Sequence, residues 1–186
     1  MVLKPLLSNR PEHSEENHNV NENTEMKNNE LIEFRDFMRN SMIKNFENDG
    51  YLTPIFFFFR NGQPMLGIIP PEALSSYESK LQLADMIRRV CQDPTVIAAG
   101  IIIEAYGAKF DKNNPLSKLV ENGDLRVSEL KEKQDIIMMV FSTPESDEII
   151  TYAVDCKNKK VGEMFAEPDF GGFSGIFSKF FNRCEN

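Results

Sequence analysis

The sequence predicts an α+β domain in which helices pack on a largely antiparallel sheet of five or six strands. Residues 96–104 form an almost unbroken apolar, β-branched run, which is typical of a strand buried on both faces. Asn61-Gly62 separates two other apolar runs and predicts a hairpin. Apolar residues recur with helical spacing over residues 31–46 and 77–91. The resulting order of helix, hairpin, helix, strands and helix favours an antiparallel sheet.

The N-terminal segment is the polar part of the chain. Residues 8–30 contain Pro11, Val20 and Met26 as their apolar residues, among many Asn and Glu. Such a segment buries too little surface to offset the entropy of ordering it. We therefore expect a disordered acidic tail over residues 1–28 and a single α+β domain over residues 29–186.

The first helix is predicted over residues 29–48, and Asp49-Gly50 provides its end. Its apolar stripe consists of Leu31, Phe34, Phe37, Met38, Met42 and Phe46. A stripe of this kind is typical of a helix that packs on a core.

Two strands are predicted next, over residues 52–59 and 65–69. Pro54 and Pro64 lack a backbone donor and therefore belong at strand starts or on an edge of the sheet. Four consecutive phenylalanines, Phe56 to Phe59, need helices on both faces of the sheet or a partner surface on one face. We expect helices on both faces.

The second helix is predicted over residues 76–92, with a capping box formed by Ser75 and Glu78. Asp93-Pro94 ends it before the apolar run at residues 96–104. A long polar connection over residues 107–133 follows, and connections of this length are often functional. The remaining strands are predicted over residues 136–141, 148–155 and 160–165.

The C-terminal segment carries large apolar residues at positions i, i+3, i+4, i+7 and i+8, which predict an amphipathic final helix. The residues concerned are Phe173, Ile176, Phe177, Phe180 and Phe181. This helix either packs on its own sheet or docks on another subunit, so these five residues are the candidate partner-binding residues.

Composition disfavours several classes of function. A net charge of −8 and a pI near 4.9 disfavour direct nucleic-acid binding. No apolar run reaches membrane-spanning length, so no membrane partner is expected. Three widely spaced cysteines do not suggest a disulfide framework, which favours a cytoplasmic location. Both histidines lie in the tail and no cofactor motif is found, so neither a metal nor a cofactor is expected.

The candidate catalytic residues are Glu104, Ser128 and Lys131. Glu104 closes the apolar run, and the segment before the next long strand contains the other two. A carboxylate near a lysine and a hydroxyl can act as a general acid or base when burial tunes its pKa. In the structural alternative, Glu104 caps a loop backbone or pairs with a lysine.

The order of predicted elements resembles that of profilin-like and roadblock-type domains over about residues 29–183. This resemblance implies a module that binds protein partners. A second pattern resembles uncharacterised bacterial and phage α+β proteins and implies a fold outline without an activity. It comprises Asp49-Gly50 before Pro54, Glu104-Ala105-Tyr106 at a strand exit, and Ser128, Glu129, Lys131 and Lys133 leading into Ile136. Gln134 stands where that pattern has an acidic residue.

The leading functional hypothesis is a non-catalytic cytoplasmic protein–protein interaction module. It would bind a protein partner or self-associate through an exposed strand or the last helix. The alternative is a small enzyme or a small-molecule-binding protein with its site at the Glu104 strand end.

Overall fold

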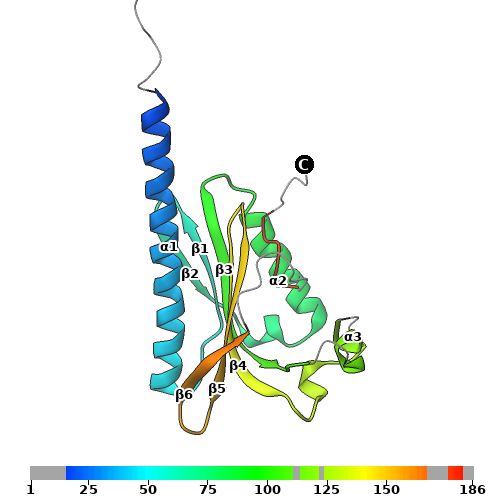
Figure 1. Ribbon diagram of the computed structural model, residues 1–186. Helices are drawn as coiled ribbons and strands as arrows, with labels where there is room; N and C mark the ends of the chain where they lie inside the picture. Colours follow the sequence, from blue (N-terminus) through cyan, green and yellow to red (C-terminus); the bar gives the residue numbers. More distant parts are fainter. Residues whose placement is uncertain (1–15, 111–113, 122–123, 167–175, 182–186) are drawn as a thin grey trace, which may run out of the picture.

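The computed structural model describes residues 16–110, 114–121, 124–166 and 176–181, with backbone alone for residues 16–28, 121 and 165–166. The strands form one sheet, and helices lie on both of its faces (Figure 1). The elements are α1 (Glu16–Asp49), β1 (Ile55–Arg60), β2 (Gln63–Ile68), η1 (Pro71–Leu74), α2 (Tyr77–Val90), β3 (Val96–Gly107), α3 (Pro115–Glu121), η2 (Val127–Glu129), β4 (Gln134–Ser142), β5 (Asp147–Asp155) and β6 (Lys160–Ala166).

The sheet has six strands in the order β2-β1-β3-β4-β5-β6. Every neighbouring pair is antiparallel. The predicted α+β class with a largely antiparallel sheet is therefore confirmed. The central position of β3, between β1 and β4, explains why its sequence is apolar on both faces.

Alternate residues of β3 belong to two different hydrophobic cores. Ala98 and Ile102 pack on the α1 side of the sheet, whereas Ala99, Ile101 and Ile103 pack on the α2 side. All five are less than 9% exposed. The run that predicts a two-sided strand thus forms one, with a helix over each face (Figure 1).

Helix α1 packs its apolar stripe on one face of the sheet. Phe34, Met38, Met42 and Phe46 recur every fourth residue and are all buried. The Phe34 ring lies edge-on to Phe57, with 5.6 Å between ring centroids. These contacts secure the C-terminal half of the helix on the sheet.

The C-terminal end of α1 lies where the sequence predicts it, whereas the N-terminal end does not. Gly50 follows the last helical residue with a φ of +80°, so the predicted end is confirmed. The helix begins at Glu16, well before residue 29. Its first part has no apolar stripe in the sequence, and apolar spacing therefore did not reveal it. Residues 1–15 lie outside the described residues, so disorder of this part of the tail stays a prediction.

Helix α2 covers the other face with Leu83, Ala84 and Ile87. Its N-terminal capping box differs from the predicted one, because Ser76 and Ser79 exchange side-chain and backbone hydrogen bonds in place of Ser75 and Glu78. A serine hydroxyl three residues after the cap is short but still reaches the cap N–H, at 3.1 Å.

The C-terminal segment differs from its prediction. Residues 176–181 form a turn and an irregular stretch, so the described part of the expected final helix is not helical. Lys179 adopts a positive φ of 53°, which interrupts a helix. The Arg88 guanidinium of α2 donates hydrogen bonds to the carbonyl oxygens of Ile176 and Ser178, at 2.9 and 3.2 Å. The segment is thereby held against α2, beside the sheet.

Gly100, in the middle of β3, leaves room for an aromatic ring of the neighbouring strand. A Cβ at this position would overlap the ring of Phe57 and the carbonyl oxygen of Val140. The Phe57 ring, on the neighbouring strand β1, lies over the glycine and fills the space that a side chain would take.

We expect Gly100→Ala to lower the free energy of unfolding by about 3 kcal/mol, because the added methyl displaces buried ring and backbone atoms. Equilibrium urea denaturation measures this change. Gly162→Ala is the matched control, since its Cβ meets its nearest atom at 3.3 Å, and we expect a change below about 1 kcal/mol. Equal effects at the two glycines would contradict the described packing.

Phe180 provides a test of the C-terminal segment. It is 1% exposed and belongs to the α2-side core, so we expect Phe180→Ala to destabilise the chain by about 3–5 kcal/mol. Tyr77→Ala, at a 67% exposed position, should cost less than about 0.5 kcal/mol. A Phe180→Ala chain of unchanged stability would show that this segment does not pack on its own sheet.

Candidate functional site: an open sheet edge beside a groove

The β1–β2 hairpin presents the edge of the sheet, and its turn fixes the register. Asn61 and Gly62 both have positive φ, 52° and 73°, as a type I′ turn requires. Arg60 therefore pairs with Gln63, and the pairing continues to Ile55 opposite Ile68. The predicted Asn-Gly hairpin is confirmed.

This register decides which backbone groups of β2 point away from β1. The Ile69 N–H donates to the Pro54 carbonyl at 2.8 Å, so that pair is hydrogen-bonded. Bonded and non-bonded pairs alternate along an antiparallel ladder. The backbone groups of Pro64, Leu66 and Ile68 therefore point outward from the sheet. Pro64 occupies a position at which its missing donor costs no bond to β1.

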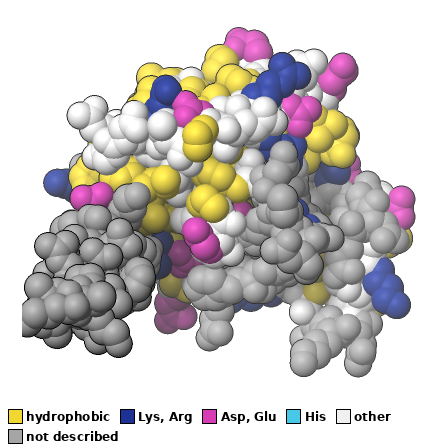
Figure 2. Space-filling model, turned by 90° about the horizontal axis from the view of Figure 1, so that it is seen from above, with side chains coloured by type: hydrophobic (Ala, Val, Ile, Leu, Met, Phe, Trp, Pro, Cys, Tyr) yellow, Lys and Arg dark blue, Asp and Glu magenta, His cyan; other side chains and the backbone are white. Residues whose placement is uncertain are grey.

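The side chains of β2 are exposed and uncharged. Met65, Leu66 and Ile68 are 49%, 59% and 70% exposed. Seen from above, the surface shows hydrophobic side chains interspersed with acidic and basic ones (Figure 2). β2 itself contains no charged residue. A bare apolar edge of this kind is a template for pairing with another chain.

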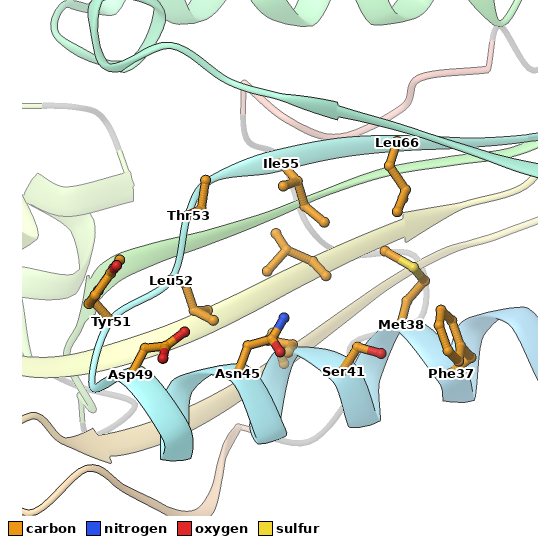
Figure 3. Close-up of a pocket in the computed structure, with 12 residues that line it drawn as sticks. Phe37, Met38, Ser41, Asn45, Asp49, Tyr51, Leu52, Thr53, Ile55 and Leu66 are labelled. Atoms are coloured by element: carbon orange, nitrogen blue, oxygen red, sulfur yellow. The ribbon is translucent and has the colours of Figure 1, made fainter.

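A groove of about 370 Å³ lies beside this edge, on the α1 side of the sheet. One wall comes from α1, and the other wall comes from β1, β2, β3 and the chain before β1 (Figure 3). The α1 wall consists of Phe37, Met38, Ser41, Met42, Asn45 and Asp49, and the opposite wall of Tyr51, Leu52, Thr53, Ile55, Leu66 and Ile102.

The groove is apolar at one end and polar at the other. Phe37 and Leu66, each about 60% exposed, make one end apolar. Asn45 and Asp49 line the groove nearer the end of α1, where Asp49 adds a negative charge (Figure 3). The arrangement therefore suits a chain with apolar side chains near Phe37 and polar groups near Asp49.

The opposite edge of the sheet is different. Strand β6 carries Lys160 and Glu163, both exposed, and α1 contacts it. The Lys159 ammonium donates to the Asn48 carbonyl at 3.2 Å and so holds the β5–β6 turn to the end of α1. Charged side chains discourage strand pairing, so β2 is the less protected edge.

The structure gives Glu104 a backbone partner. One oxygen of its carboxylate accepts a hydrogen bond from the Leu52 N–H at 2.5 Å. This bond fixes the chain between α1 and β1, which matches the structural alternative considered for Glu104. Its catalytic role stays a prediction.

A smaller pocket of about 210 Å³ lies beside Glu104 and is lined also by Tyr106, Asp135 and Cys156. Neither Ser128 nor Lys131 is among its lining residues. The Ser128 carbonyl accepts a hydrogen bond from Lys133 at 2.6 Å, and the Lys133 ammonium lies 4.6 Å from the centre of the Tyr106 ring. Lys131 is exposed. The predicted trio is therefore not assembled around this pocket.

The pocket does not activate its cysteine. Burial, followed by the nearby carboxylates of Asp135 and Glu104, raises the pKa of the Cys156 thiol above its usual value. Burial also raises the pKa of Cys91 to about 12. Nucleophilic cysteines need a lowered pKa, so both thiols are in the wrong environment for that chemistry.

The predicted partner-binding residues lie mostly in the core. Phe177, Phe180 and Phe181 are at most 7% exposed and pack on the α2 side, with Ile176 against them. Phe173 lies outside the described residues. In this conformation the three buried rings are not surface for a partner, and their role in binding stays a prediction.

The described residues contain neither a membrane-spanning helix nor a metal-binding cluster. None of the helices there combines the length and apolar character needed to cross a membrane. Groups of three or more His, Cys, Asp or Glu side chains in a metal-binding arrangement are likewise lacking there.

Comparison with known proteins gives no match: neither a protein-family model, nor a curated protein, nor a solved structure is similar to this chain.

The groove and the outward groups of β2 were not identified from the sequence. A usable signal was present, because residues 63–68 contain a proline and no charge directly after an Asn-Gly turn. A proline in a predicted strand indicates an edge, and the lack of charge indicates an edge without protection.

We expect Asp135→Asn to speed alkylation of Cys156 at pH 8 by about two- to fivefold. Loss of the carboxylate removes one contribution that raises the thiol pKa, so the thiolate fraction increases. Iodoacetamide labelling followed by mass spectrometry measures the rate in a Cys184→Ser background. Asp85→Asn, on α2, is the control. A slower reaction in Asp135→Asn would contradict the described surroundings of Cys156.

Proposed function

We propose that this chain is a non-catalytic cytoplasmic protein-interaction module that takes up an extended segment at the β2 edge. The observation that carries the proposal is the exposed, uncharged β2 strand with outward backbone groups at Leu66 and Ile68. Strand addition uses such groups for affinity and neighbouring side chains for specificity.

The chemistry of the bound segment follows from the edge. Its backbone would accept hydrogen bonds from the Leu66 and Ile68 N–H groups and donate to the carbonyl of Pro64. Its side chains on the α1 side would lie beside Leu66 and approach the Phe37 end of the groove. Apolar residues at alternate positions are therefore preferred.

The alternative function at Glu104 has less support. The carboxylate already accepts the Leu52 N–H, and Ser128 and Lys131 do not line the adjacent pocket. A capped loop accounts for Glu104 without catalysis.

Selection of displayed ten-residue peptides on the full chain tests the proposal. We expect selected peptides to contain alternating apolar residues and to bind with micromolar affinity in fluorescence anisotropy. Leu66→Asp places a charge at the centre of the edge, and we expect it to weaken binding at least tenfold.

Tyr77→Asp is the matched control, because Tyr77 is as exposed as the β2 residues but lies on α2. We expect unchanged affinity in that variant. The proposal is wrong if no peptide is selected, or if the selected peptides bind wild type and Leu66→Asp equally well.

A further inference from the structure

We propose that the segment taken up by β2 is β2 of a second copy of this chain, paired antiparallel about Leu66. This inference rests on the proposed function, since it uses the same edge and names the partner. The two copies would form one continuous sheet related by a two-fold axis.

The outward groups of β2 match those of a second β2 in this register. Leu66 faces Leu66 of the partner subunit, and each N–H donates to the other carbonyl. The Ile68 N–H of each copy donates to the carbonyl of Pro64 in the other copy. Pro64 has no N–H to return, so one donor is missing on each side of the axis.

Charge favours the same edge. Each chain carries a net charge of −8, so two copies repel each other over most of their surface. β2 contains no charged residue, and the proposed register sets apolar side chains opposite one another: Leu66 against Leu66 of the partner subunit, and Pro64 against Ile68 of the partner subunit. The β6 edge carries Lys160 and Glu163 and lacks this self-complementarity.

The axis of the pair is perpendicular to the sheet, so the α1 helices of both copies lie on the same face. Their Phe37 flanks then face each other across the paired β2 strands. The strand that remains at each outer edge is β6, which is the charged one. Pairing is therefore complete with two chains and does not continue into a fibre.

One six-residue strand per copy makes a small interface. Interfaces below the standard size, roughly 800 Å² per partner, are typical of weak and transient complexes. We therefore expect a dissociation constant on the order of micromolar or above for the dimer.

Sedimentation equilibrium of the full chain over a range from 1 to about 300 μM tests the inference. We expect a concentration-dependent shift from 21.3 kDa towards twice that mass. Leu66→Asp places two carboxylates opposite each other at the axis, and we expect the dissociation constant to rise at least a hundredfold. Tyr77→Asp should leave it unchanged.

Pro64→Thr tests the register itself. Threonine restores the missing N–H opposite Ile68 of the partner subunit, once on each side of the axis, so we expect about tenfold tighter association. Circular dichroism and urea denaturation of each variant verify that the monomer is folded.

A wild-type chain that stays monomeric throughout this range overturns the inference, as does a dimer that Leu66→Asp leaves intact. A Pro64→Thr dimer that is no tighter than wild type overturns the register about Leu66. Peptide binding that persists in a strictly monomeric chain would retain the proposed function while removing the second copy as its partner. A chain that neither binds peptides nor dimerises would contradict the proposed function as well.

Discussion

The fold depends on burial of both faces of β3. This central strand is apolar along both faces, so one helix layer must lie on each side of it. α1 provides one layer, and α2 with residues 176–181 provides the other. A six-stranded sheet is about 24 Å wide, whereas one helix covers about 10 Å. α1 contacts β4 and β6, and within the part of the chain that the structure describes no strand pairs with the outer side of β2. The open edge and its groove are thus consequences of how the core closes.

The sequence predicted the parts of the fold that depend on local patterns. The apolar run from Val96, the Asn61-Gly62 turn and the stripe from Phe34 to Phe46 each carry their own periodicity or turn chemistry. The structure places each of them as expected. Because hairpin links dominate, the antiparallel arrangement followed from these local elements.

The incorrect or missing parts depend on contacts between distant residues. Spacing of i, i+3 and i+4 at residues 177, 180 and 181 suits a helix, but a turn with Lys179 at positive φ buries the same three rings. Glu104 meets the Leu52 N–H across 52 positions of sequence, and no motif reports such a contact. The groove joins Phe37 of α1 to Leu66 of β2, so it exists only once the sheet and helix are assembled.

In the proposed pairing, the outward amides of β2 are open in one chain and become paired in two. Residue-resolved amide hydrogen exchange by NMR, at low and high protein concentration, measures this most directly. At low concentration the Leu66 and Ile68 amides should exchange fast, while Met65 and Gly67, which face β1, are protected. At high concentration Leu66 and Ile68 should slow, and Met65 should change little by comparison. Protection of Leu66 and Ile68 that is the same at both concentrations would contradict the account.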